Sequence, residues 1–195
     1  MESLKEICSR IELQKEAEKA ILAMEEKQEF SQEDKEILRL TEAENWEKAR
    51  ESLKKSIGED PQGMKILCCM LKAAAISLEK YREQEIEDRV FDDTMKCFTR
   101  FVEEHKASYG IYGFDRDFWT GRQLSLQLFR LGELEYEKKG HKEGERYISI
   151  HIPSDALLTP EKIRESLSRA KVFFEKQDPS WENVPYKCCS WLLSP

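Results

Sequence analysis

The spacing of apolar residues changes along the chain, and this change constrains the fold more than any other feature. Up to about residue 105 the apolar residues recur at intervals of three and four, the period of a helix with one buried side. Two glycines and three aromatic residues then fall within residues 108–115, which does not fit a helix interior. From residue 134 apolar and charged residues alternate, as in a strand. The sequence predicts an α+β protein with a helical N-terminal bundle at 1–113 and a mixed α/β domain at 114–195.

The spacing of apolar residues and the capping residues predict several helix boundaries in the N-terminal part. A change of phase predicts a short helix that ends near Leu13 and a longer one from Gln14. Ser31, followed by acidic residues, has the character of an N-cap for the next helix. Near the end of this part, one apolar stripe predicts a single helix from Ile86 to about His105.

Glycine, proline and aspartate mark two further helix starts. Gly58 is suited to end one helix, while Asp60 as N-cap and Pro61 in the first turn are suited to begin the next. Asp115 is predicted to cap a helix that contains Trp119.

The C-terminal part has the pattern of strand, strand, helix, strand. Residues 126–137 are predicted to form one strand whose acidic face is solvated. A loop at 138–144 leads to a second strand at 146–152, and the two strands are expected to form a hairpin. Thr159 then caps a helix, and residues 186–193 form a last strand.

Composition excludes several classes of protein. The net charge of -7 argues against nucleic-acid binding, which depends on Lys and Arg. No apolar run approaches the roughly 20 residues that cross a bilayer, and the N-terminus lacks the apolar core of a signal peptide. We therefore expect a cytoplasmic protein without a membrane partner.

Six cysteines are present, but their spacing does not form a disulfide framework, so we expect reduced thiols. The three histidines are far apart in sequence and there is no CxxC motif, so we expect no metal site. The cysteines are Cys8, Cys68, Cys69, Cys97, Cys188 and Cys189.

Several segments together resemble one family of bacterial proteins. They are residues 70–72, 93–101, 112–116, 129–136, 151–155 and 190–193. The family is described as acyltransferase-domain proteins, with a helical N-acyltransferase N-terminal domain followed by a GNAT-like C-terminal domain. The resemblance implies transfer of an acyl group from acyl-CoA, as co-substrate, to an amine of a small molecule or protein. Members of the family continue past the sequence that ends at Pro195, so the GNAT-like domain is expected to be partial.

The binding of coenzyme A is the point where the chain departs from GNAT enzymes. Those enzymes hold the pyrophosphate with a Q/R-x-x-G-x-G/A loop, and no such run occurs here. Its counterpart is the turn at 153–159, where a helix N-terminus offers amides to an anion, with Ser154 and Thr159 as candidate cofactor-binding residues. Asp155 and Glu161 lie in the same region, and their charges oppose a pyrophosphate.

His151, Glu135 and Tyr136 are the candidate catalytic residues. His151 ends a strand and has a side chain suited to a general base, although a structural role is also open. Glu135 can receive a substrate ammonium together with its neighbours, or simply face solvent. Tyr136, like Ser154 and Ser190, is a possible proton donor to the leaving thiolate.

Two other functions remain open. A non-catalytic GNAT-like module that binds a small molecule or a protein is favoured by the absent glycine motif. Thioester chemistry through Cys188 or Cys189 is a third hypothesis, which requires a base or cation beside the thiol. The acyl chain, the acceptor and the oligomeric state are not specified by the sequence.

Overall fold

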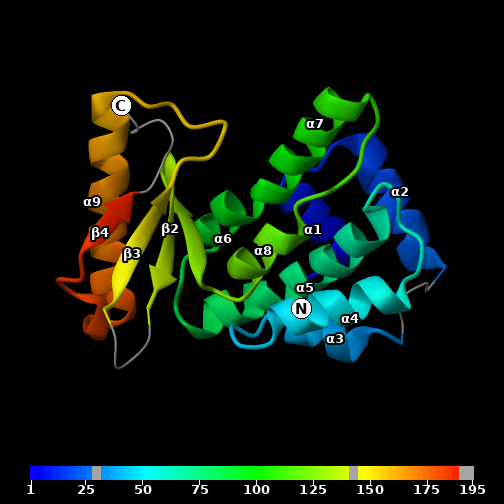
Figure 1. Cartoon of the computed structure of the whole chain (residues 1–195), viewed down its shortest axis with the longest axis horizontal. Helices are drawn as coiled ribbons and strands as arrows, with labels where there is room; N and C mark the ends of the chain where they lie inside the picture. Colours follow the sequence, from blue (N-terminus) through cyan, green and yellow to red (C-terminus); the bar gives the residue numbers. More distant parts are fainter. Residues whose placement is uncertain (28–31, 141–144, 189–195) are drawn as a thin grey trace. The chain divides into compact units, whose positions relative to one another are not determined.

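The chain forms two compact units, Met1–Leu126 and Gln127–Pro195. The computed structural model describes residues 1–27, 32–140 and 145–188 (Figure 1). Ser31, Cys189 and Ser190 lie outside the described residues. The secondary structure of the first unit is helical and the second unit holds a sheet and a helix, so the predicted α+β class is confirmed.

The helices of the first unit cover most of its length. They are α1 Leu4–Arg10, α2 Lys15–Glu26, α3 Asp34–Arg39, α4 Trp46–Ser56, α5 Met64–Glu83, α6 Asp88–Met95, α7 Cys97–Tyr109 and α8 Asp117–Leu124. The predicted break near Leu13 is confirmed, because α1 ends at Arg10 and Glu12 has a positive φ of 57° before α2 begins.

Helix α5 forms the centre of the first unit. It contacts α1, α2, α3, α6 and α8, and in Figure 1 it runs among the other helices of this unit. Its apolar side is wide, with Leu67, Leu71 and Leu78 fully buried. Cys68 and Cys69 are fully buried as well, so they are core residues.

Two predicted helix starts and one predicted helix differ from the structure. The N-cap of α5 is Gly63 rather than Asp60, although the Asp60 carboxylate still accepts hydrogen bonds from the amides of Lys65 and Ile66. The cap residue of α8 is Arg116, because the Asp115 carboxylate pairs with the Arg116 guanidinium at 2.7 Å instead of capping the helix.

The single helix predicted from Ile86 to His105 is also wrong, since the segment forms α6 and α7. Lys96 lies between the two helices, as the C-cap of α6 and the N-cap of α7. The apolar spacing continues across the interruption: Phe91 and Met95 on α6 and Phe98 on α7 are all fully buried.

The compact units divide at Leu126, later in the chain than the junction predicted at 113/114. Helix α8 packs on α4 and α5. The Ser77 hydroxyl of α5 donates to the carbonyl of Leu124 at 2.6 Å, and Gly121 lies so close to the Trp46 ring that a Cβ there would meet it at 1.9 Å. These contacts place α8 in the first unit.

The second unit contains one sheet and one long helix. Its elements are β1 Leu128–Leu131, β2 Leu134–Lys139, β3 Tyr147–His151, α9 Pro160–Gln177, the short helix η1 Pro179–Trp181 and β4 Tyr186–Cys188. The strand order is β1-β2-β3-β4, with β1, β2 and β3 antiparallel and β4 parallel to β3.

The single strand predicted at 126–137 is in fact a hairpin. Gly132 has a positive φ of 82° and turns the chain with Glu133 between β1 and β2. Glycine at the first position of a two-residue loop is typical of such turns. The predicted pairing of 146–152 with the preceding strand is confirmed by the antiparallel pairing of β2 with β3.

Helix α9 covers one face of this sheet (Figure 1). Its Phe173 and Phe174 pack on Phe129 of β1, with ring centroids 4.8 and 6.2 Å away. The N-cap of the helix is Thr159, whose side chain accepts from the Lys162 amide, as predicted. No helix in the described residues is long and apolar enough to span a membrane.

Candidate functional site

The strand register places a row of charged side chains on the sheet face opposite α9, and we call it the polar face. Residues directly opposite one another in paired strands share a face, and side chains alternate along each strand. The register pairs Arg130 with Glu135 and Glu135 with His151. The polar face comprises Arg130, Glu135, Glu137, Lys139, Tyr147, Ser149, His151 and Lys187, with the apolar Leu128 of β1 beside them, opposite Glu137.

His151 is held on the polar face by a carboxylate. Its Nε2 lies 2.9 Å from Oε2 of Glu137, while the other Glu137 oxygen lies 2.7 Å from Nζ of Lys139. The Glu137 side chain is 3% exposed and the His151 side chain 25% exposed. Because an ionised carboxylate only accepts hydrogen bonds, Nε2 carries a proton, and in the neutral ring Nδ1 carries the lone pair. The geometry gives His151 a fixed tautomer and orientation.

The acidic residues of β2 are buried, which corrects the predicted solvated face. Glu135 and Glu137 are both 3% exposed. Charged side chains are rarely buried without partners. The partners of Glu137 come from β3 and from the end of β2, where His151 and Lys139 contact its carboxylate. Glu133 lies in the β1–β2 turn and not on the strand with the other two.

Tyr136 lies on the opposite face of the sheet, under α9. It is fully buried, and its hydroxyl is 2.9 Å from Oγ of Ser166. Burial raises the pKa of Tyr136 to about 12, against a smaller opposing effect of the Ser166 hydrogen bond. The structure therefore brings His151 and Glu135 together but separates Tyr136 from them. Cys188, directly opposite Ile150 in the register, belongs to the face of Tyr136 and not of His151.

The turn predicted to bind coenzyme A is tied to the β1–β2 turn by ionic contacts. Arg130 lies 2.7 Å from Asp155, and the amide of Leu157 donates to the Glu133 carboxylate at 2.9 Å. Ser154 and Thr159 are both exposed in this turn. Protein carboxylates thus already contact the Arg130 guanidinium and the Leu157 amide, which lies just before the N-cap of α9.

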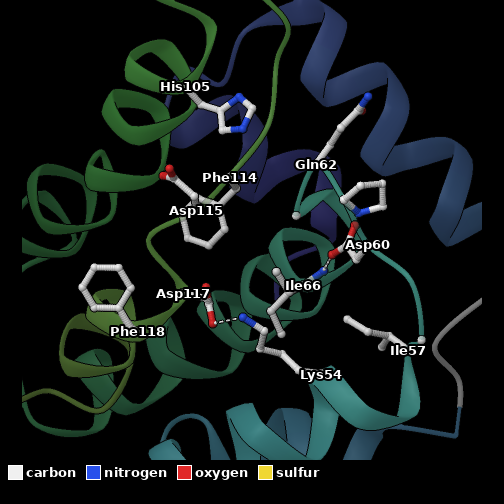
Figure 2. Close-up of a pocket in the computed structure, with 13 residues that line it drawn as sticks. Lys54, Ile57, Asp60, Gln62, Ile66, His105, Phe114, Asp115, Asp117 and Phe118 are labelled. Carbon is white, nitrogen blue, oxygen red and sulfur yellow. Dashed lines mark hydrogen bonds and ion pairs between the residues drawn. The ribbon is translucent and has the colours of Figure 1, made fainter. Parts of the chain in front are cut away.

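A pocket of about 470 Å³ lies within the first unit (Figure 2). Its wall is formed by the end of α4, the loop at 57–63, the first turn of α5, His105 of α7, and residues 114–118. Two backbone segments make close contact here, since the Phe114 amide donates to the Gln62 carbonyl at 2.8 Å. A Cβ at Gly63 would lie 1.8 Å from the Phe114 oxygen, so only glycine fits.

Sequence reasoning did not find this pocket. The segments around Gly58 and Gly113 predict only a helix boundary and a domain junction. Two glycine-containing segments that border buried helices were the available signal, but their pairing is a long-range contact that local spacing does not encode. Among the described residues, no group of three or more His, Cys, Asp or Glu side chains could hold a metal ion.

Sequence comparison identifies both units. The N-acyltransferase N-terminal domain matches residues 2–126, and the GNAT-like C-terminal domain matches residues 128–195. The first match covers more than half of the chain, so the chain belongs to the family of proteins with an N-acyltransferase N-terminal domain. No curated protein sequence matches the chain.

Several solved structures have a similar fold. An acyltransferase in complex with CoA and 10C-teicoplanin has a TM-score of 0.79 and 20% identity, over 100% of this chain and 63% of that one. An acyltransferase in complex with decanoyl-CoA and teicoplanin has a TM-score of 0.78 and 20% identity, over 97% and 62%. An acyltransferase mutant in complex with octanoyl-CoA has a TM-score of 0.77 and 21% identity, over 97% and 62%. The chain spans less than two thirds of the length of these proteins.

Proposed function

We propose that this protein transfers an acyl group from an acyl-CoA to the amine of a small molecule. The observation that carries the proposal is the contact between His151 Nε2 and the buried Glu137 carboxylate. Membership of the N-acyltransferase family and the acyl-CoA ligands of proteins with a similar fold support it.

In the proposed reaction His151 is the general base. The amine nitrogen attacks the thioester carbonyl carbon while Nδ1 of His151 takes the proton that the amine loses. The tetrahedral intermediate then collapses, the carbon–sulfur bond breaks, and the sulfur leaves as the thiol of coenzyme A after it accepts a proton. Glu137 stabilises the imidazolium that forms between the two steps, because its negative charge is fixed 2.9 Å from Nε2.

Glu135 has a different role in this proposal. It lies opposite His151 in the register and is buried to the same extent as Glu137. A carboxylate at this position attracts the ammonium form of the acceptor and helps to place its nitrogen near the base. Tyr136 has no part in direct proton transfer in this proposal, because it lies under α9 on the other face of the sheet.

Ser154 and Thr159 are the proposed contacts to coenzyme A. Thr159 Oγ1 accepts from the Lys162 amide, so its hydroxyl hydrogen remains available to a phosphate oxygen. Arg130, already at this turn, supplies a guanidinium suited to phosphate. A pyrophosphate would compete with Asp155 and Glu133 for these groups.

That competition favours a second candidate function, a non-catalytic module with a GNAT-like fold. The Leu157 amide and the Arg130 guanidinium already contact protein carboxylates. A module of this kind would bind a small molecule or a protein without turnover.

Two experiments test the proposal. The first is calorimetric titration with decanoyl-CoA, acetyl-CoA and CoA. The second is an assay of thiol release with a panel of primary amines. We expect one-to-one binding and amine-dependent thiol release. His151→Ala is expected to retain affinity and to lower kcat by about 10²- to 10⁴-fold. Binding without release under any condition supports the non-catalytic module, and the absence of binding contradicts the proposal.

The two buried glutamates provide a matched pair for the same assay. Glu137→Gln removes the charge that faces Nε2, so kcat is expected to fall while the KM for the amine changes little. Glu135→Gln is expected to raise the KM for the amine more than it lowers kcat. Equal effects of the two variants on both constants would contradict the separate roles.

A further inference from the structure

The pocket of the first unit has an acidic lining. Asp60, Asp115 and Asp117 line it, whereas Lys54 is the one ammonium group among its lining residues. Lys54 is already paired with Asp117 at 3.0 Å, a contact drawn as a dashed line in Figure 2. Among the residues that the structure describes, Asp115 is paired with Arg116 alone, and its side chain is 39% exposed. An exposed pair of this kind is held weakly and leaves the carboxylate accessible to a ligand.

His105 adds a second, uncharged acceptor to the pocket. Its side chain is only 8% exposed, and its Nδ1 lies 2.9 Å from the carbonyl oxygen of Ile111. A carbonyl only accepts, so Nδ1 carries the hydrogen and Nε2 carries the lone pair in the neutral ring. Nε2 has no hydrogen-bond partner among the described residues. Figure 2 shows the ring directed toward the space that the other labelled side chains surround.

Apolar side chains form part of the remaining wall, which also includes Gln62. Phe114, Ile57 and Ile66 are buried, while Phe118 is 50% exposed at the edge. The volume of about 470 Å³ falls in the range of small-molecule sites. An exposed aromatic ring at the edge of the pocket offers a face against which the apolar body of a ligand can pack.

We propose that this pocket binds a small organic cation, with an ammonium group held by Asp115 and Nε2 of His105 and an apolar body against Phe118. The carboxylates and the imidazole lone pair all accept hydrogen bonds, so the ligand group that fits them is a donor with positive charge. A phosphate has the opposite charge and would be repelled by three carboxylates, which separates this site from a site for coenzyme A. The proposal does not depend on whether the chain transfers acyl groups.

The test uses the whole chain and two probes of matched shape. 2-Phenylethylammonium and 2-phenylethanol share the aromatic body but differ in charge. Each is titrated while the His105 ring resonances are followed by NMR. We expect saturable shifts with the ammonium probe, and binding of the alcohol that is weaker by about tenfold or more.

Two aspartate variants provide the control. Asp115→Asn removes a carboxylate of the pocket, and we expect it to weaken binding of the ammonium probe about threefold to fivefold. Asp93→Asn makes the same change at a surface pair with Arg89, where the Asp93 side chain is 37% exposed, and we expect no change in affinity. Equal affinity for the two probes, equal weakening by the two variants, or shifts of His105 that saturate with coenzyme A would each overturn the proposal.

Discussion

Helix α5 and strand β2 are both buried, but different physical effects keep them so. The buried side chains of α5 include Leu67, Leu71 and Leu78, which gain free energy directly from removal of apolar surface from water. In β2, Glu135 and Glu137 are buried beside Leu134 and Tyr136. Burial of these carboxylates costs free energy unless polar partners compensate. The stability of the first unit should therefore depend on volume, and that of the second unit on hydrogen bonds and charge.

The largest effect is expected from loss of volume in α5. Leu71→Ala leaves a cavity at a fully buried position, and should lower the free energy of unfolding by about 2–5 kcal/mol, measured by urea denaturation. Leu38→Ala is the control, because Leu38 is 45% exposed and should change stability by less than about 0.5 kcal/mol. Similar effects of the two variants would break the contrast between α5 and the surface.

A smaller effect is expected from the charge of Glu137. Glu137→Gln weakens the contacts with His151 and Lys139 and should destabilise the second unit by about 1–3 kcal/mol. The control is Glu145→Gln, since Glu145 pairs with Lys187 at 2.8 Å but is 71% exposed. That variant should cost less than about 1 kcal/mol. If Glu137→Gln lowers the free energy of unfolding no more than the control does, burial of the Glu137 carboxylate does not strengthen its contacts, and the inference is wrong.

On the other face of the sheet, the hydroxyl of Ser166 tests whether hydrogen bonds stabilise the second unit. It donates to the Leu131 carbonyl at 2.6 Å, accepts from the Leu134 amide at 3.2 Å and contacts the Tyr136 hydroxyl. Ser166→Ala should destabilise the second unit by about 1–2 kcal/mol, because buried groups lose their partners. Ser168→Ala, at an exposed position of the same helix, is the matched control and should be nearly neutral. Equal losses of unfolding free energy in the two variants would contradict a stabilising role for the Ser166 hydrogen bonds.

The two units should also differ at alkaline pH, with no effect near neutrality. Burial raises the pKa of Cys8 and Cys69 from 9.0 to about 12, and that of Tyr136 from 10.0 to about 12. A raised pKa means that the folded state holds the proton more tightly, so stability is full below the unfolded pKa and falls above it. The first unit should therefore lose stability from about pH 9 and the second from about pH 10, measured by unfolding at each pH. Rapid alkylation of Cys8 or Cys69 at pH 7 would contradict the raised pKa values.

The parts of the fold that sequence predicted are those set by local spacing. The break near Leu13 and the N-cap at Thr159 depend on a few neighbouring residues, and both are confirmed. The turn at Gly132 was missed because leucines on both sides continued the strand pattern. The helix start at Gly63 was missed because Asp60, three residues earlier, has the side chain of an N-cap. Its carboxylate does accept from the amides of Lys65 and Ile66 in the first turn.

The candidate site was predictable only in part, for a similar reason. His151 was singled out by its position at a strand end, and alternation placed it on the face of Ser149 and Tyr147. Its contact with Glu137 is diagonal across two strands and depends on a register that the sequence did not specify. The adjacent Tyr136 was proposed for the same chemistry, but the two-residue period of a strand turns it to the other face.

The proposed chemistry depends most directly on the protonation of the His151 ring. Long-range proton–nitrogen correlation spectra of the imidazole, recorded for the whole chain and for His151→Ala to assign the signals, report which nitrogen carries the hydrogen. We predict a protonated Nε2 that donates to Glu137 and, in the neutral ring, an unprotonated Nδ1. A neutral ring with the hydrogen on Nδ1 and none on Nε2 would contradict the pairing with Glu137 and the role of His151 as the base.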